Sequence, residues 1–313
     1  MTYLITGGTG SMGKQLTKNL LADKLTKRIV IYSRDEYKHA VMGEELNDKR
    51  LRFFIGDVRD EPRLELAMQG VDYCIHTAAL KRVEQGEYEP REFKKTNIDG
   101  SECVINACMA TNVKRAVLLA TDKGVEAINI YGQSKGFAES EFIASNHYKP
   151  IFSVVRYGNV VSSRGSVVQR YMGIRERGEK VYPVTDPGMT RFAMTYDMAI
   201  HLVMLALREQ AQQIFVAKAK SFDLASLVKA FRGKMEIIGE RPGEKLHEVL
   251  IHRYESRRAQ DFWNHFRIRP QLPYDDSIKY TQGNPLEPMY EYNSHDNPAR
   301  MSVDDIREMI GGL

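Results

Sequence analysis

Four residues in one short stretch carry side chains that can move protons. Asp122 and Lys123 are adjacent, and Tyr131 and Lys135 follow them in the run TDKGVEAINIYGQSK. Tyr131 and Lys135 are four residues apart, so on a helix they lie on one face, where the lysine can hold the phenol near its deprotonated state. Such a pair is enough to oxidise an alcohol. The additional acid and base at Asp122 and Lys123 are what an elimination of water requires.

The composition is typical of a soluble globular protein. The 313 residues are 42% hydrophobic and 27% charged, which suffices for one large core or two linked cores. The net charge is only +4, and the basic residues are scattered rather than gathered in a stripe with aromatic residues. We therefore expect no nucleic-acid partner.

The cysteines and the apolar runs indicate the compartment. Cys74, Cys103 and Cys108 are odd in number and form no CxxC pair, which predicts reduced thiols, no disulfide framework and no metal site. The chain opens on strand-like residues 3–6 rather than on a basic and then apolar leader, and no run of about 18 apolar residues occurs. We expect a cytoplasmic protein without a signal peptide or a membrane span.

Short apolar runs alternate with amphipathic segments through the first half of the chain. The expected strands are residues 3–6, 28–33, 52–57, 72–78, 115–121 and 151–160, and the expected helices include 13–24, 61–68, 97–112 and 131–146. This βαβ alternation predicts an α/β fold with a Rossmann-like, doubly wound parallel sheet and right-handed crossovers.

The alternation ends after about residue 163. Residues 164–191 are expected to form a loop with one helix, 193–210 a helix, and 214–217 a strand that returns to the main sheet. The rest is more irregular and contains many of the prolines. We predict a Rossmann domain of residues 1–163 plus about 192–218, and a smaller C-terminal substrate-binding lobe of residues 164–191 and 219–313.

A glycine-rich loop joins the first strand to the first helix. In GGTGSMG, residues 7–13, the glycines allow a tight turn and let a pyrophosphate approach the backbone and the helix N-terminus. The triple alone is weak evidence, but its place between strand and helix makes it a strong prediction of dinucleotide binding. The candidate contacts in this loop are Gly7, Thr9, Gly10, Ser11, Met12 and Gly13.

The residues after the second strand bear on which dinucleotide is bound. The hydroxyl of Ser33 and the guanidinium of Arg34 suit a ribose 2′-phosphate, and Lys38 adds charge, which favours NADP over NAD. Asp35 keeps NAD open, because a carboxylate here suits a free 2′-hydroxyl, and Arg34 could instead stack on adenine. The candidate set is Ser33, Arg34, Asp35, Glu36 and Lys38.

Two later strand ends offer weaker evidence of cofactor contacts. Asp57 and Val58 suit a contact with adenine, but an ordinary turn explains them equally well. Thr77, Ala78 and Ala79 are small enough for the chain to pass close to a cofactor, although small residues at a strand end are also common packing.

The arrangement of motifs resembles the extended short-chain dehydrogenase/reductase superfamily. The segments LITGGTGSMG, SRDE, GDVRD, AALKRV, KTNIDG, ATDK, NIYGQSK, RYGNVVSSRGSVV, TDPGMTRF and RPGEKLHEVLI occur in this order. Together they resemble the polysaccharide-biosynthesis branch that contains the inverting UDP-N-acetylglucosamine 4,6-dehydratases of the pseudaminic acid type. The resemblance runs from Thr2 to about Ile310.

The resemblance implies a role for each residue of the catalytic set. Tyr131 would take the proton of the sugar C4 hydroxyl, to which Thr121 would hydrogen-bond, and Lys135 would lower the pKa of Tyr131 and bind the nicotinamide ribose. Lys123 would remove the C5 hydrogen as general base, and Asp122 would protonate the departing C6 hydroxyl. Water would be lost with inversion at C5, and NADP would be regenerated. Lys123 would have to be partly neutral, which burial and a neighbouring nicotinamide cation would favour.

The resemblance also implies a nucleotide-sugar site. Lys81 would lie near cofactor and sugar, Val160 beside the nicotinamide, and Asn159 at the substrate phosphates. The remaining implied substrate contacts are Arg164, Gly165, Ser166, Val167, Val168, Thr185, Arg191, Arg241 and Glu244. For Arg191 and Arg241 a structural or surface role fits the sequence equally well.

The function expected from the resemblance is an NADP-dependent, inverting UDP-N-acetylglucosamine 4,6-dehydratase. A C4 epimerase needs only the Tyr131–Lys135 pair, and C5-retaining dehydratases commonly have Asp-Glu where this chain has Asp122-Lys123. A non-catalytic NADP-binding protein usually lacks the tyrosine or the lysine. Ala120, Ala127, Gln169 and Gly188 depart from the usual family pattern and leave the C2 substituent of the sugar open.

A homo-oligomer, either a dimer or a hexamer, is also expected. In relatives the helices that correspond to residues 97–112 and 131–146 form a dimer bundle. Packing of these helices on the sheet explains their small residues equally well.

Overall fold

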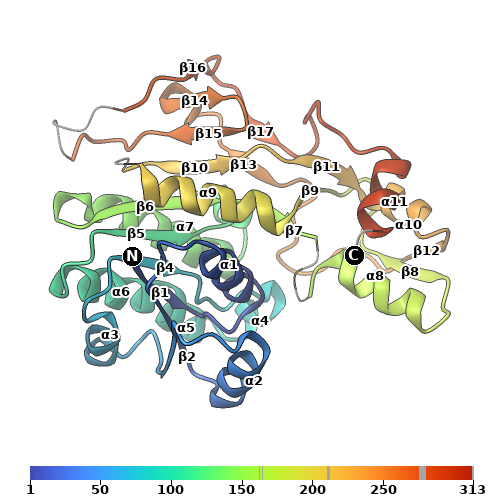
Figure 1. Ribbon diagram of the computed structural model, residues 1–313. Coiled ribbons are helices and arrows are strands. Elements are labelled where there is room, and N and C mark those ends of the chain that lie inside the picture. The colour runs from blue at the N-terminus through green and yellow to red at the C-terminus, as the bar shows by residue number, and fades with distance from the viewer. Residues whose placement is uncertain (162, 164, 210–211, 275–279, 312–313) are drawn as a thin grey trace.

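A ten-stranded sheet forms the centre of the computed structural model, which describes residues 1–161, 163, 165–209, 212–274 and 280–311 (Figure 1). In spatial order its strands are β16 (Asn284–Pro285), β14 (Ala259–Phe262), β15 (His265–Ile268), β10 (Ile214–Ala217), β6 (Ile151–Arg156), β5 (Arg115–Leu119), β4 (Tyr73–His76), β1 (Thr2–Thr6), β2 (Arg28–Ser33) and β3 (Leu51–Ile55). From β3 to β10 all neighbours are parallel, and β15, β14 and β16 extend the sheet with antiparallel pairs.

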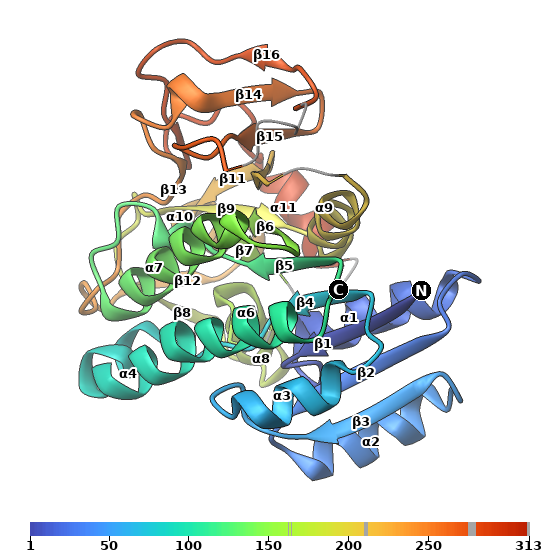
Figure 2. The same cartoon turned by 90° about the vertical axis from the view of Figure 1, so that its left-hand side faces the viewer.

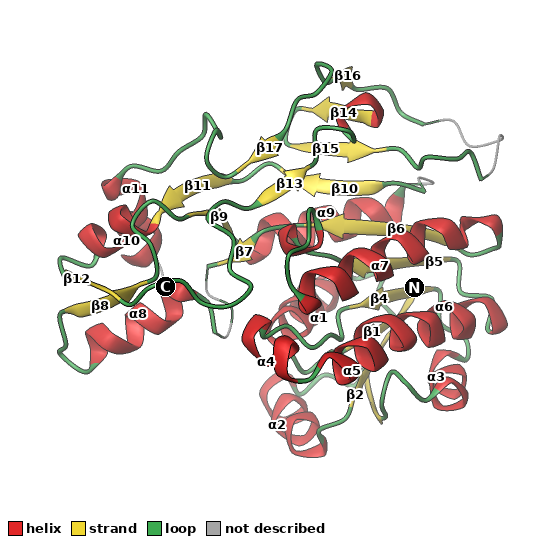
Figure 3. Ribbon diagram, turned by 180° about the vertical axis from the view of Figure 1, so that it is seen from behind, coloured by secondary structure: helices red, strands yellow, loops and turns green. Residues whose placement is uncertain are grey.

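Helices cover both faces of the parallel part, which is why its strands consist largely of buried apolar residues. One face carries α1 (Ser11–Ala22) and α9 (Tyr196–Arg208), and the other, seen from behind in Figure 3, carries α3 (Glu61–Met68), α6 (Gly100–Ala110) and α7 (Ile130–Ala144). The other helices of this half are α2 (Glu36–Leu46), α4 (Val83–Tyr88) and α5 (Pro90–Phe93), with a π-helical turn at Lys94–Asp99.

The remaining elements build a second layer of structure beside the carboxyl ends of the parallel strands. Its sheets are β11 (Lys220–Asp223), β9 (Thr190–Met194) and β7 (Asn159–Val160); β12 (Lys234–Ile237) and β8 (Val181–Val184); and β13 (Val249–Ile251) and β17 (Tyr292–Asn293). Its helices are α8 (Val167–Glu176), α10 (Leu224–Ala230) and α11 (Val303–Gly311). They enclose a separate apolar cluster that includes Tyr171, Tyr182, Phe222, Leu227 and Ile306.

The doubly wound α/β fold predicted from the sequence is confirmed, with local differences. The segment 164–191 contains α8 and also β8 and part of β9, so the prediction of a loop with one helix was wrong. The helix expected over 193–210 begins only at Tyr196, because the residues before it pair with β11. The helix α2 was not predicted, and the strand expected over 151–160 is interrupted by Tyr157 and Gly158.

The C-terminal part of the chain also divides differently from the expectation. Residues 259–268 and 284–285 were assigned to the smaller lobe, but they form β14, β15 and β16, which are hydrogen-bonded to the main sheet through β10. Figure 2 shows these strands at one end of the sheet, beyond α9. The division into a cofactor domain and a substrate lobe stays a prediction, with this boundary corrected. Within the described residues no helix has the length and apolar character that crossing a bilayer requires.

A buried arginine joins the main sheet to the C-terminal segments. Arg156, at the end of β6, is only 2% exposed and forms ion pairs with Glu139 of α7 and with Glu255, the latter at 2.8 Å. It also donates a hydrogen bond to the carbonyl oxygen of Leu250 in β13. Both carboxylates are largely buried, so this guanidinium is an ion-pair partner of two charges with little access to water.

We predict that Arg156→Ala lowers the free energy of unfolding by about 3 to 5 kcal/mol, since it removes the ion-pair partner of two largely buried carboxylates. Urea denaturation followed by circular dichroism measures this. Arg307→Ala removes an arginine whose partner, Asp304, is exposed, and it should change stability far less. Equal effects of the two substitutions on the free energy of unfolding would contradict the stabilising role of the Arg156 ion pairs.

Candidate active site

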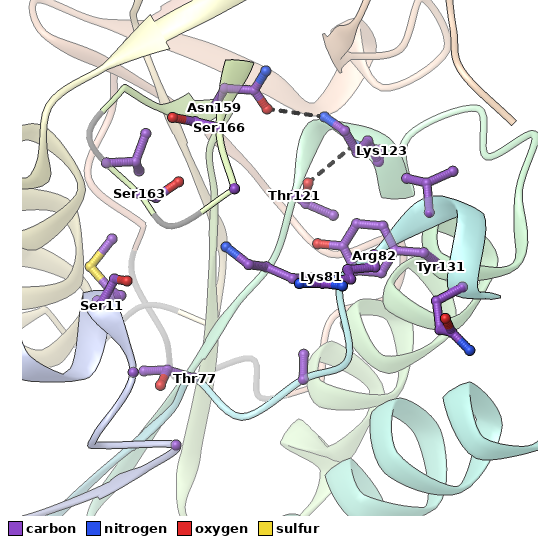
Figure 4. Close-up of a pocket in the computed structure, with 18 of the residues that line it drawn as sticks. Ser11, Thr77, Lys81, Arg82, Thr121, Lys123, Tyr131, Asn159, Ser163 and Ser166 are labelled. Atoms are coloured by element: carbon purple, nitrogen blue, oxygen red, sulfur yellow. Dashed lines mark hydrogen bonds between the residues drawn. The ribbon is translucent and has the colours of Figure 1, made fainter. Parts of the chain in front are cut away.

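A cavity of about 1370 Å³ lies along the carboxyl ends of the parallel strands, where ligands bind in folds of this type. Its wall combines residues that follow β1 to β6 with residues of α8, β8 and the segment before β13. Figure 4 shows Ser11 and Thr77 on one side of this space and Thr121, Lys123, Tyr131 and Asn159 on another, with Lys81 extending between them.

Most residues predicted from the sequence line this cavity. They are Gly7, Thr9, Gly10, Ser11, Met12, Gly13, Ser33, Arg34, Asp35, Lys38, Asp57, Val58, Thr77, Ala78, Ala79, Lys81, Thr121, Lys123, Tyr131, Asn159, Val160, Gly165, Ser166, Val167, Thr185, Arg191, Arg241 and Glu244. Four predicted residues that the structure describes do not line it: Glu36, Asp122, Lys135 and Val168. Arg164 lies outside the described residues.

The glycine loop has no room for larger residues. Gly7 has a φ of +62°, and a Cβ there would lie 2.9 Å from Cα of Ala78. A Cβ on Gly13 would lie 2.5 Å from the backbone of Gly8. Gly10 precedes α1 without a side-chain cap, so the first N–H groups of the helix stay available to an anion. The loop therefore fits a dinucleotide pyrophosphate.

Polar groups at the end of β2 and just after it line the cavity. The hydroxyl of Ser33 lies 3.0 Å from that of Thr9 and 2.7 Å from Nε2 of His39. Asp35 caps α2 by accepting a hydrogen bond from the backbone N–H of Lys38, and its carboxylate is 2.6 Å from the Lys38 ammonium. Arg34 is exposed and 3.7 Å from Asp57. The carboxylate that would favour NAD is thus already paired.

The acid–base pair lies on a short 3-10 turn, Asp122–Gly124, just after β5. Thr121 begins this turn, and its side chain accepts a hydrogen bond from the backbone N–H of Lys123 and donates one to Asp122 Oδ1 at 3.0 Å. The backbone N–H of Asp122 donates to the carbonyl oxygen of Tyr157. These bonds fix both side chains at the carboxyl end of the sheet.

The ammonium of Lys123 is enclosed by three acceptors. Its Nζ lies 3.0 Å from Asp122 Oδ1, 3.0 Å from Glu248 Oε1 and 3.2 Å from Asn159 Oδ1. Burial alone would lower the pKa of Lys123, but the carboxylates of Asp122 and Glu248 together raise it well above its usual value. The expectation that Lys123 is partly neutral beside a bound nicotinamide cation stays a prediction, and in the protein without ligands Glu248, a partner that the sequence did not reveal, favours the charged form.

The environment of Asp122, in contrast, favours the protonated and uncharged form of its carboxyl group. Asp122 is completely buried, and burial raises the pKa of its carboxyl group despite the opposing effect of Lys123. Its Oδ2 atom has no hydrogen-bond partner among the described residues. A carboxyl group that tends to hold a proton in a buried site is suited to act as a general acid.

The Tyr131–Lys135 pair lies at the start of α7, as predicted. Asn129 caps the helix by accepting a hydrogen bond from Gly132 N, and it donates another to the carbonyl oxygen of Gly243 at 2.7 Å. Burial raises the pKa of Tyr131; the groups that oppose this rise are Lys123 and Thr121, which hydrogen-bonds to the phenol. Burial lowers the pKa of Lys135 to about 8, against the effect of Glu139.

Sequence reasoning missed Glu248. Its carboxylate is 2% exposed, contacts Lys123 and lies 3.8 Å from Nε of Arg191. It belongs to the segment RPGEKLHEVLI, which was recognised as a motif, but nothing in the spacing distinguished this glutamate from Glu244. Other cavity residues that were not predicted include Lys14, Arg82, Asn129, Tyr157, Tyr196 and Lys245.

We predict that Gly13→Ala abolishes dinucleotide binding, measured by calorimetry, because the added Cβ would collide with the Gly8 backbone. Gly173→Ala, in α8, is the control: its Cβ would meet only the end of Arg177, at 3.6 Å. Thermal melting confirms that each variant is folded. Binding by a folded Gly13→Ala protein at normal affinity would refute the role of the loop.

The chain is similar to known proteins over nearly its whole length. The chain is 40% identical to the "UDP-N-acetylglucosamine 4,6-dehydratase (inverting)" of Campylobacter jejuni subsp. jejuni (strain 81-176), over 98% of this chain and 96% of that protein. It is 38% identical to the "UDP-glucose 4-epimerase" of Rickettsia bellii (strain RML369-C), over 100% and 96% of the two chains. The X-ray structure of Pen from Bacillus thuringiensis superposes with a TM-score of 0.90 at 32% identity, covering 100% and 98%. Residues 3–270 match the family described as polysaccharide biosynthesis protein, and the chain belongs to this family.

Proposed function

We propose that the protein is an NADP-dependent UDP-N-acetylglucosamine 4,6-dehydratase that inverts the sugar at C5. The observation that carries the proposal is that an amine, Lys123, lines the cavity together with Tyr131, while a buried acid, Asp122, contacts that amine from behind the cavity wall. The similarity to the Campylobacter jejuni dehydratase over nearly the whole chain supports the same assignment.

The reaction divides among the residues of the chain. Tyr131 accepts the proton of the C4 hydroxyl, and Thr121 orients that hydroxyl. A nicotinamide dinucleotide held by the glycine loop would supply the hydride chemistry that the changes at C4 and C6 require. The C4 carbonyl makes the C5 hydrogen acidic, so Lys123 can remove it as a neutral amine. Asp122 then donates its proton to the departing C6 hydroxyl, and water leaves. Addition of a proton to C5 from the face opposite to the one that lost it completes the reaction with inversion.

NADP is proposed over NAD because of how the end of β2 is arranged. Ser33 offers a hydroxyl toward the cavity, and Arg34 adds an exposed guanidinium that can pair with a 2′-phosphate. Asp35 is held by Lys38, so it is less available to a free 2′-hydroxyl.

The other end of the cavity is proposed to hold the UDP group. Arg241 and Lys245 line it, as does Arg191, which is buried against Glu248, so cations face the space where a pyrophosphate would lie. Arg241 is 3.9 Å from Glu244, a weak pair that leaves the guanidinium able to bind phosphate. Homo-oligomer formation stays a prediction.

A C4 epimerase is the second candidate, favoured by the 38% identity to the Rickettsia bellii protein of that name. Epimerisation moves only the hydrogen at C4 and requires no acid at C6. An epimerase would therefore have no use for the acid Asp122 and the base Lys123.

Incubation of the protein with UDP-N-acetylglucosamine and NADP in heavy water, followed by NMR, tests these functions. We expect a 6-deoxy-4-keto sugar with one deuterium at C5 and the L-arabino configuration. A D-xylo product would exclude inversion, and a C4 epimer that retains its C6 hydroxyl would identify an epimerase.

Lys123→Met should retain cofactor binding and lower turnover by at least about a thousandfold, since no base would remain for C5.

We predict that Arg34→Ala weakens NADP binding at least tenfold and leaves NAD binding nearly unchanged, since the guanidinium would contact only the 2′-phosphate. Fluorescence titration with the reduced forms of both cofactors measures this. Arg52→Ala, on β3 and away from the cavity, is the control, because its guanidinium donates only to backbone carbonyl groups. Equal losses for both cofactors would instead indicate stacking of Arg34 on adenine.

A further inference from the structure

Glu248 is a buried carboxylate in the cavity wall to which the proposed reaction gives no role. Its backbone is held in both directions by Ser294, since Glu248 N donates to Ser294 Oγ at 2.9 Å and Ser294 N donates to Glu248 O at 2.8 Å. Its Oε1 contacts the Lys123 ammonium at 3.0 Å, whereas Oε2 has no hydrogen-bond partner among the described residues. An anchored carboxylate with one unpaired oxygen beside a reacting amine calls for an explanation.

The surroundings of Lys123 match its charged form. An ammonium has three N–H donors and no acceptor, and three oxygen acceptors surround this one: Asp122 Oδ1, Glu248 Oε1 and Asn159 Oδ1. A general base at C5 must be a neutral amine. One proton therefore has to leave this cage, which consists of the Lys123 amine and its three acceptors, before the elimination can start.

Only a carboxylate in the cage can accept that proton without involving solvent. Asp122 has to keep its own proton for the leaving C6 hydroxyl, and its Oδ1 already accepts hydrogen bonds from Thr121 and Lys123. Asn159 presents an amide, which is not a base. Glu248 is ionised beside two cations, because Lys123 and Arg191 lower the pKa of its carboxyl group although burial alone would raise it.

The charges around the pair allow the transfer once water is excluded. Lys123 faces Asp122 on its own turn, Glu248 and Lys245 before β13, Arg191 of β9 and Tyr131 of α7. Moving one proton across the 3.0 Å contact from Lys123 to Glu248 converts an ion pair into a neutral pair and leaves the net charge unchanged. Loss of water when a substrate fills the cavity favours the neutral pair, since buried charges are costly.

We propose that Glu248 is a positioning residue that acts through Lys123: it holds the ammonium in the free enzyme and takes over one of its protons when substrate enters. This inference rests on the proposed dehydratase function. The Lys123 N–H bond breaks and a Glu248 O–H bond forms, which leaves an amine that removes the C5 hydrogen. Lys123 is then an ammonium again, and Glu248 still holds the transferred proton until the product leaves.

The first test is independent of turnover. The ε-carbons of the lysines are labelled with ¹³C, the Lys123 signal is assigned from its absence in Lys123→Met, and its shift is followed against pH in the free protein. Glu248→Gln should lower the titration midpoint of Lys123 by at least one pH unit, a tenfold fall in proton affinity, because a negative charge 3.0 Å away is removed. An unchanged midpoint overturns the proposal.

The second test is the dependence of kcat on pH with UDP-N-acetylglucosamine. In the parent enzyme the proton stays within the pair, so kcat should be constant between about pH 7 and 9. In Glu248→Gln the amine must lose its proton to solvent, so kcat should fall at least tenfold at pH 7 and rise roughly tenfold per pH unit up to the Lys123 midpoint. Glu248→Asp, which restores a carboxylate, should recover the constant profile.

The controls separate this role from a structural one. Glu240→Gln removes an exposed carboxylate just before the segment RPGEKLHEVLI and should leave kcat and its pH profile unchanged. If Glu248→Gln lowers kcat by the same factor at every pH, Glu248 is merely structural and the proposal is overturned. If the parent enzyme does not dehydrate UDP-N-acetylglucosamine, the proposed function fails, and the lysine titration alone decides whether Glu248 controls the protonation of Lys123.

Discussion

The arrangement of the site depends on the positive charge of Lys123, a partly buried side chain. Lys123 lies in the cavity wall, where its charge is balanced by Glu248 from a distant segment of the chain and its ammonium also donates to Asp122 Oδ1. Isolated buried charges are among the most costly features a protein can contain, so these three side chains have to meet for the fold to be stable. The same interaction sets the chemistry, because it decides which group holds a proton before substrate arrives.

Several polar contacts hold the parts of this cluster together. Thr190 of β9 shares a hydrogen bond with Ser294 and donates its backbone N–H to Leu246 O, so β9 and the segment that carries Glu248 are joined. Asn129 connects the start of α7, and with it Tyr131, to the turn at Gly243. The acid, the base and the phenol are thus tied to one framework, which limits their relative movement.

At the end of the cavity proposed to bind the dinucleotide, the glycine loop and the N-terminus of α1 contribute mainly backbone groups. Gly13 is required by a close contact with Gly8 within the loop and Gly7 by one with Ala78 after β4, and the uncapped N-terminus of α1 provides the polar groups. Most residues of this half could be predicted from the sequence, since each follows a predicted strand and the carboxyl ends of parallel strands meet at one edge of the sheet. Glu36 was predicted with the others but faces away from the cavity, because it lies in the first turn of α2 beside the capping Asp35.

What the sequence alone determined are features of short range: the alternation of strands and helices, the glycine loop, the Tyr131–Lys135 spacing on α7 and the adjacency of Asp122 and Lys123. What only the tertiary structure decided is the electrostatic state of these groups. Nothing near Lys123 in the sequence indicates that Glu248 contacts it, and a glutamate before a strand is usually exposed. The protonation of a buried amine depends on every charge within a few ångströms, and those neighbours are fixed only when distant segments pack together.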